Sequence, residues 1–261
     1  MNFTDLKAEV LDLARCCEGR AAVYIQTEDG VIETNADDSY SSASLIKVPI
    51  LFAGLTQAEK GLLQLEEEVI VKDDSRVGGS GVLQAMTKGL KVKMLDLMTL
   101  MIIVSDNTAA NLIIEILGKE KINQLIKGFG LDKTELTRRM MDFEALRNGI
   151  DNKTTARDMV KSLKALAEHT ILSGKYTELA LRILEEQQYK NKLANTMDTE
   201  RVKVASKTGE LPGIEHDCAI FTSNGKTVYA AVLVDQLQNQ AAGKEVLSSI
   251  GSRIYRFIVH E

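Results

Sequence analysis

A serine and a lysine three residues apart form the most chemically suggestive pair in this chain. Ser44 and Lys47 enter an apolar run with helical spacing, so both side chains fall on one helix face, one turn apart. A serine hydroxyl is a weak nucleophile at its own pKa and needs a base within hydrogen-bonding reach. A lysine removed from water can be that base. Alone, such a pair is more often a solvated helix face; as a site, it would be a nucleophile, Ser44, with Lys47 as its base.

Two later stretches add polar groups that such a reaction can use. Ser105-Asp106-Asn107 follows an apolar helical run, and Lys207-Thr208-Gly209 ends a stretch with strand periodicity. Alone, the first would be a helix N-cap, and the second a strand end with a turn. In order after Ser44 and Lys47, they indicate one catalytic site.

The composition excludes several function classes. The 261 residues are 44% hydrophobic and 26% charged, as in an ordinary globular protein. A net charge of −5 without a basic tract argues against a nucleic-acid partner. No apolar run approaches the roughly 18 residues of a membrane span, so no transmembrane segment is predicted. The three histidines show no zinc-binding spacing, and we expect neither a metal nor a cofactor.

The first twenty residues bear on the compartment. They carry Asp5, Glu9 and Asp12 and lack the apolar core of a secretory signal. As written, the sequence predicts a cytoplasmic protein, or a secreted one whose signal peptide has been removed. Cys16 and Cys17 are adjacent, and the three cysteines predict no disulfide framework.

Strand patterns lie at both ends of the chain, and helical patterns fill the middle. The expected strands span residues 21–26, 31–34, 202–206, 219–222 and 227–234. Amphipathic helices precede the first strand and follow the last. We therefore predict an α+β fold, with an antiparallel sheet flanked by the terminal helices and an inserted all-helical domain. Residues 1–42 and 188–261 would form a discontinuous sheet domain, and residues 43–187 the helical domain.

The three motifs together resemble those of class A serine β-lactamases and their penicillin-binding relatives. Ser44-Leu45-Ile46-Lys47, Ser105-Asp106-Asn107 and Lys207-Thr208-Gly209 match the S-x-x-K, S-D-N and K-T-G motifs in order and spacing. The resemblance covers most of the chain, because the expected layout of strands and helices also agrees. It implies a β-lactamase-like fold with the active site in the cleft between the two domains.

The resemblance also implies roles for the residues that move protons. Ser44 would be the acylated nucleophile, and Lys47 its base or proton relay. Ser105 would pass a proton to the leaving amide nitrogen. Asp106 is expected to be structural and to satisfy loop amides.

Five further residues would bind the substrate, again by resemblance. Asn107 would hydrogen-bond the amide of the substrate's side chain, and Lys207 and Thr208 would hold its carboxylate. Gly209 would let the ligand approach the backbone. The backbone N–H groups of Ser44 and Glu210 would form the oxyanion hole. No motif assigns a role to His216, which is expected to border the cleft.

The chain departs from the resemblance in the loop that should supply a water-activating glutamate. Class A enzymes carry R-x-E-x-x-L-N there, and this chain reads RRMMDFEALRN over residues 138–148. If Arg139 takes the place of the arginine, Met141 takes that of the glutamate. Asp142 and Glu144 are near enough for a shifted loop to present one of them. An arginine that holds the substrate carboxylate in many relatives also has no clear match after Lys207.

These observations predict a serine hydrolase that opens the β-lactam amide through a Ser44 acyl-enzyme and then hydrolyses it. One alternative is a penicillin-binding D-Ala-D-Ala peptidase or esterase with slow deacylation. A second alternative is a non-catalytic module that binds β-lactams or peptidoglycan fragments.

Overall fold

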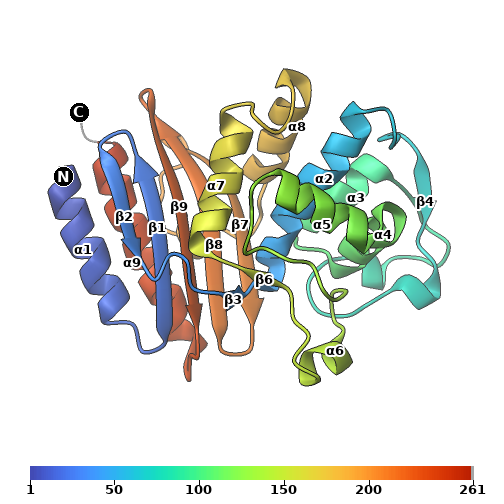
Figure 1. Ribbon diagram of the computed structural model, residues 1–261, viewed down its shortest axis with the longest axis horizontal. Helices are drawn as coiled ribbons and strands as arrows, with labels where there is room; N and C mark the ends of the chain where they lie inside the picture. The colour runs from blue at the N-terminus through green and yellow to red at the C-terminus, as the bar shows by residue number, and fades with distance from the viewer. Residues whose placement is uncertain (260–261) are drawn as a thin grey trace.

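A five-stranded antiparallel sheet runs through the molecule in the order β2-β1-β9-β8-β7 (Figure 1). The structure is a computed structural model, and it describes residues 1–259. The strands of this sheet are β1 (Arg20–Thr27), β2 (Gly30–Thr34), β7 (Lys203–Leu211), β8 (Ile214–Ser223) and β9 (Lys226–Asp235). Because β1 pairs with β9, the N-terminal hairpin and the C-terminal strands join in one sheet.

The terminal helices α1 (Phe3–Arg15) and α9 (Gln240–Ile258) cover one face of this sheet (Figure 1). Side chains of a strand alternate between the two faces, so every second residue of β9 can point toward these helices. Val232 accordingly packs in one buried cluster with Leu6 of α1 and Leu247 of α9. Asn2 caps α1 by accepting a hydrogen bond from the N–H of Asp5.

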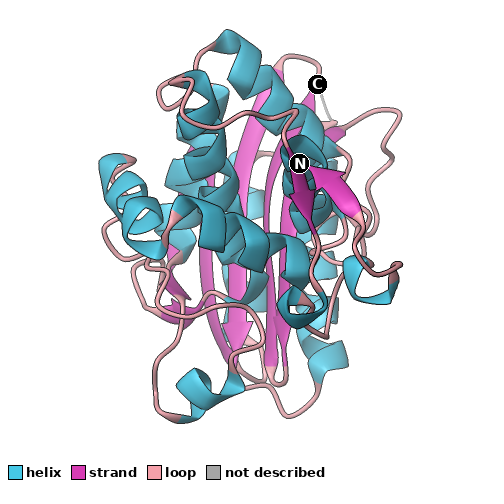
Figure 2. Cartoon of the chain, turned by 90° about the vertical axis from the view of Figure 1, so that its right-hand side faces the viewer, coloured by secondary structure: helices cyan, strands magenta, loops and turns pink. Residues whose placement is uncertain are grey.

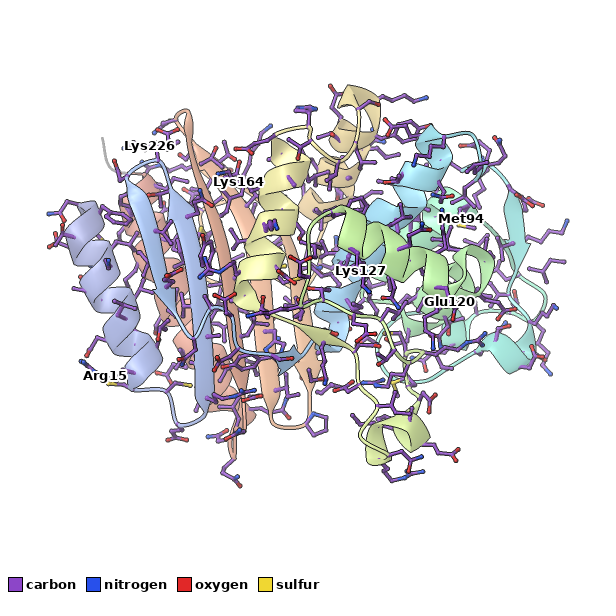
Figure 3. The ribbon with its side chains drawn as sticks, in the orientation of Figure 1. Arg15, Met94, Glu120, Lys127, Lys164 and Lys226 are labelled. Atoms are coloured by element: carbon purple, nitrogen blue, oxygen red, sulfur yellow. The ribbon has the colours of Figure 1, made fainter. Side chains whose placement is uncertain are left out.

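The opposite face of the sheet carries a second buried cluster and the remaining helices (Figure 2). Met159 and Leu163 of α7 (Ala156–Ala167) pack in this cluster with Ala231 and Leu233 of β9. The other helices are α2 (Lys47–Glu59), α3 (Met94–Ile103), α4 (Asn107–Leu117), α5 (Lys119–Gly128), α6 (Phe143–Arg147) and α8 (Gly174–Glu185). The charged side chains of Arg15 on α1 and Glu120 on α5, both labelled in Figure 3, are exposed.

Helix α2 is the centre of the helical part. Residues 47–58 are all buried, so the helix is enclosed on every side, as expected for one that is apolar all round. A 3₁₀ turn, η1 (Ala43–Ile46), leads into it. The fixed φ of Pro49 fits here, because it is the third residue of α2, where an amide has no partner within the helix.

Short elements complete the helical part. They are the strand pairs β3 (Tyr40–Ser41) with β6 (Lys153–Thr154) and β4 (Glu68–Ile70) with β5 (Lys91–Lys93), and the 3₁₀ turns η2 (Asp73–Ser75) and η3 (Leu83–Ala85). The prediction of an α+β fold with an antiparallel sheet and flanking terminal helices is confirmed. The proposed domain boundaries stay a prediction, and the last two residues of the 188–261 segment lie outside the described residues.

Candidate active site

Ser44 lies in the short turn η1, which packs beside the edge strand β7. Ala43 adopts a left-handed backbone with φ 44°, which turns the chain sharply just before the serine. A Cβ on Gly209 of β7 would come within 3.3 Å of Ala43 Cβ and of Leu45 Cγ. The absence of a side chain at Gly209 therefore lets the turn that carries Ser44 lie against the strand.

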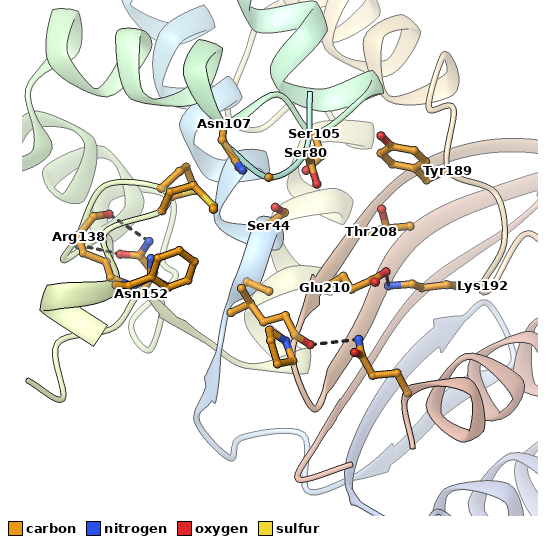
Figure 4. A pocket seen from close by; sticks show the side chains of 18 of the residues that line it. Ser44, Ser80, Ser105, Asn107, Arg138, Asn152, Tyr189, Lys192, Thr208 and Glu210 are labelled. Carbon is orange, nitrogen blue, oxygen red and sulfur yellow. Dashed lines mark hydrogen bonds and ion pairs between the residues drawn. The ribbon is translucent and has the colours of Figure 1, made fainter. Parts of the chain in front are cut away.

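Ser44 opens into a cleft of about 630 Å³ (Figure 4). Residues from the sheet edge, the helical part and the loops line it: Ala43, Ser44, Gly79, Ser80, Ser105, Asn107, Arg138, Met140, Met141, Phe143, Asn152, Tyr189, Asn191, Lys192, Thr208, Glu210, Leu211, Pro212 and Gln240. The cleft therefore brings together Ser44, Ser105, Asn107, Thr208 and Glu210 from the predicted set. Lys47, Lys207 and Gly209 lie behind this lining.

Lys47, the first residue of α2, is completely buried one turn after Ser44. Its Nζ lies 3.1 Å from Oγ of Ser105 and donates hydrogen bonds to the carbonyl of Ser105 (2.7 Å) and to Oδ1 of Asn107 (2.8 Å). Burial, and secondly the nearby charge of Lys207, hold the pKa of Lys47 well below that of an ordinary lysine. The neutral amine that a base requires is thereby favoured.

The hydroxyl of Ser105 stands between two lysines. Besides the contact to Lys47, its Oγ lies 3.0 Å from Nζ of Lys207, which is also fully buried. Burial lowers the pKa of Lys207 to about 7. Ser105 is held in a left-handed backbone conformation with φ 54°. One hydroxyl thus links two lysines on the wall of the cleft that contains Ser44.

Asp106 and Asn107 hold this wall together. Asp106 caps α4 through Oδ1 and accepts the N–H groups of Val82 and Leu83 through Oδ2, at 2.7 and 2.9 Å. The prediction that Asp106 satisfies loop amides is confirmed. Asn107 donates through Nδ2 to the carbonyl of Gly78. The glycine-rich loop before Val82 is therefore packed against the site, which the sequence did not indicate.

The loop over residues 138–148 is anchored by Arg138, not by Arg139. Arg138 is buried and makes a 2.8 Å ion pair with Asp151, whereas the pair of Arg139 with Glu115 is exposed. The third position of the R-x-E pattern therefore falls on Met140. Asn111 fixes that residue by bonding both its N–H and its carbonyl.

Neither candidate for the missing glutamate belongs to the cleft lining. Oδ1 of Asp142 caps α6, and Asp142 lines a second hollow of about 260 Å³ that shares Met140 and Met141 with the cleft. Glu144 is exposed on α6. The residues of this loop that line the cleft are Arg138, Met140, Met141 and Phe143, and none of them is a carboxylate.

The sequence model of the β-lactamase enzyme family matches residues 5–258 of this chain. The chain belongs to the β-lactamase enzyme family. β-Lactamase BRO-1 of Moraxella catarrhalis is 25% identical over 254 residues, which are 92% of this chain and 80% of that protein. The crystal structure of the β-lactamase from Sphaerobacter thermophilus superposes with a TM-score of 0.91 at 27% identity, over 97% of this chain and 96% of that one.

A penicillin-binding protein is similar to this β-lactamase-family chain to nearly the same degree. A single-residue mutant of PBP-A, solved as an acyl-enzyme complex with penicillin G, has a TM-score of 0.88 at 25% identity, over 97% of this chain and 96% of that one. The family and these neighbours support a serine hydrolase that acts on β-lactams. Among the helices within residues 1–259, none has the length and apolar character needed to cross a membrane.

Lys192 is a residue of this β-lactamase-family site that sequence reasoning missed. It lines the cleft, yet its side chain is only 2% exposed, and its Nζ lies 2.6 Å from Oε2 of the fully buried Glu215. Nζ also donates to the carbonyls of Gly209 (2.7 Å) and His216 (3.3 Å). A lysine in a polar stretch before a strand gives no signal of burial, because its partners come from residues 17 to 24 positions later.

His216 does not border the cleft, contrary to expectation. It is fully buried, with Nε2 2.8 Å from the carbonyl of Ser41 and Nδ1 accepting the N–H of Val234. Nε2 must therefore carry the ring proton and donate it to Ser41. Burial lowers the pKa of His216 to about 4. The neutral ring ties the sheet to the segment just before Ser44.

Proposed function

We propose that this protein opens β-lactam rings by forming an ester between Ser44 and the lactam carbonyl. The observation that carries the proposal is the Ser105 hydroxyl, which lies 3.1 Å from Lys47 Nζ and 3.0 Å from Lys207 Nζ beside the cleft that contains Ser44. This arrangement supplies a buried amine as a base and a hydroxyl as a proton relay in one connected network.

The acylation step follows from this network. Oγ of Ser44 attacks the lactam carbonyl, and its proton passes to the neutral amine of Lys47. Ser105 then gives a proton to the lactam nitrogen as the C–N bond breaks, and it is reprotonated from Lys47, so the protons balance. The backbone N–H groups of Ser44 and Glu210 are proposed as the oxyanion hole. One such donor is commonly worth about 10²–10³ in rate.

Hydrolysis of the ester needs a water molecule and a base that activates it. A general base typically contributes about 10²–10⁴ in rate. With Arg138 as the arginine of the pattern, Met140 takes the position of the expected glutamate, and Asp142 and Glu144 lie outside the cleft lining. This observation favours a second candidate: a penicillin-binding D-Ala-D-Ala peptidase or esterase in which the acyl-enzyme persists. The first product is the same ester in both cases.

Intact-protein mass after mixing with benzylpenicillin tests the proposal. We expect an adduct with the mass of the intact antibiotic, and none in the Ser44→Ala protein. An adduct that disappears within seconds supports a β-lactamase, and one that lasts for hours supports the penicillin-binding candidate. If wild type forms no adduct, or if the Ser44→Ala protein forms the same one, the proposed chemistry is wrong.

A further inference from the structure

A carboxylate extends into the cleft from the strand that would lie along the substrate. Thr208 and Glu210 are two residues apart on β7, so their side chains leave the same face of the strand, and both line the cleft (Figure 4). The side chain of Glu210 is 52% exposed. Among the described residues that line the cleft, Glu210 is the one carboxylate.

The two lysines near Glu210 are both shared with the buried Glu215. Lys244 of α9 lies 3.2 Å from Glu210 and 3.5 Å from Glu215. Lys192 lies 3.9 Å from Glu210, but its closer partners are Glu215 and two backbone carbonyls. Lys192, Lys244, Glu210 and Glu215 form a cluster with no net charge. Of these four residues, Glu210 and Lys192 line the cleft, and the side chain of Lys192 is only 2% exposed.

The lysines beside Ser105, Lys47 and Lys207, do not neutralise the charge of the Glu210 carboxylate. Lys47 and Lys207 have no exposed surface, and burial lowers the pKa of both amines, which weakens their positive charge at neutral pH. Arg138, the remaining cation of the lining, is paired with Asp151. Among the charged side chains of the described cleft lining, Glu210 is therefore the exposed one, at 52% against 7% for Arg138 and 2% for Lys192.

We propose that Glu210 sets the charge preference of the cleft, favouring an ammonium over a carboxylate on the part of the acyl donor that lies along β7. The inference rests on the proposed function, because it assigns the substrate class of the same site. Two like charges at contact distance in a partly desolvated cleft repel, whereas an ammonium at the same place gains an ion pair. The preferred substrates are accordingly amides or esters with a basic group near the scissile bond.

Three derivatives of one β-lactam test this preference: benzylpenicillin, its methyl ester and its 2-(trimethylammonio)ethyl ester. They share one reactive ring and carry a negative, a neutral and a positive group beside it. The rate constant of adduct formation per unit concentration is measured for each, in wild type and in Glu210→Gln. We expect wild type to prefer the cationic ester. We expect Glu210→Gln to shift the ratio of cationic to anionic rates by about tenfold toward the carboxylate.

Two further variants make the result specific. Glu210→Lys should reverse the order of the charged compounds. Glu245→Gln removes the same charge from an exposed position of α9 outside the cleft lining, and it should leave the ratio unchanged. If Glu210→Gln changes all three rates by one factor, or changes none, Glu210 does not select charge and the inference is overturned.

Binding measurements separate this inference from the proposed chemistry. Dissociation constants for the same compounds in the Ser44→Ala protein, with and without Glu210→Gln, do not depend on acylation. If the dissociation constants favour the cationic compound and this preference is lost in Glu210→Gln, the inference is supported even when wild type forms no adduct. The absence of an adduct would overturn only the proposed function. Equal dissociation constants for the cationic and anionic compounds in Ser44→Ala would overturn the inference.

Discussion

The ammonium of Lys192 and the carboxylate of Glu215 lie 2.6 Å apart, and both side chains are almost completely shielded from solvent. Lys192 precedes the edge strand β7, and Glu215 belongs to β8. The pair therefore fastens the segment before β7 beneath the cleft. Since burying two charges is costly, such a pair is stable only while both members are present.

Removal of one member should destabilise the fold. We expect Lys192→Met to lower the free energy of unfolding by about 3 kcal/mol, because the Glu215 carboxylate stays buried with the amide of Gln240 and the more distant Lys244 as its partners. Urea denaturation gives the value. Lys244→Met is the control, because that lysine is one-third exposed and its loss should change stability by about 1 kcal/mol or less. Equal losses in the two variants would contradict the argument.

Lys207 should speed the acylation of Ser44 but lower the stability of the folded protein at neutral pH. Its pKa is about 7 in the folded protein and about 10.4 in an unfolded chain, so only the unfolded state binds the proton between these values. Its contribution to stability is present above about pH 10 and is lost as the pH falls through 7. Lys207→Met removes this term. We expect a higher Tm at pH 7, a flatter pH dependence between 7 and 10, and slower adduct formation with benzylpenicillin. A lower Tm would show that the hydrogen bonds of Lys207 outweigh its burial.

A carboxylate at Met140 should shorten the life of the acyl-enzyme. Met140→Glu places a base at the third position of the loop pattern, where we expect deacylation to be faster by about 10²-fold. The decay of the benzylpenicillin adduct, followed by intact mass, measures it. Met140→Gln has a similar shape without the charge and should leave the decay unchanged. If Met141→Glu accelerates decay and Met140→Glu does not, the loop register inferred from the Arg138–Asp151 pair is wrong.

His216 and Asp217 should affect acid stability in opposite directions. The pKa of His216 is lowered to about 4 by burial, so its contribution to stability is lost as the pH falls from 6.5 to 4. The pKa of Asp217 is raised to about 7 by burial, so its contribution is lost as the pH rises from 3.8 to 7. Wild type should therefore show a weak pH dependence between 4 and 6.5.

Asp217→Asn should reveal the His216 contribution. We expect the stability of this variant to fall by about 3 kcal/mol between pH 6.5 and pH 4, measured by urea denaturation at each pH. His216→Gln should show the opposite slope, with stability falling as the pH rises. Parallel pH profiles for the two variants would mean that neither group titrates as inferred.

The sequence allowed the fold and the motif residues to be predicted because both depend on local patterns. Alternating apolar residues marked the strands, and the short motif around Ser44 and Lys47 indicated a shared helix face. The partners of Lys192 and His216 could not be predicted in this way. Those contacts depend on the register of β7, β8 and β9, which brings residues far apart in the chain to one point.

The loop over residues 138–148 shows a second limit. Two adjacent arginines fit the same pattern, and only the buried ion pair with Asp151 distinguishes Arg138 from Arg139. The choice moves the expected base by one residue, from Met141 to Met140. When two residues fit a sequence pattern equally well, a contact in the folded structure is needed to choose between them.

The pairing of β1 with β9 has a consequence for how the protein is made. Residue 23 lies opposite residue 232. The N-terminal hairpin therefore cannot pair with β9 until nearly the whole chain has been synthesised. Contacts of such long sequence separation form slowly. The edge of β1 that pairs with β9 stays unpaired meanwhile, and an unfinished chain presents this open strand edge to its neighbours. We therefore expect truncation within β9 to yield aggregates rather than a weakened enzyme.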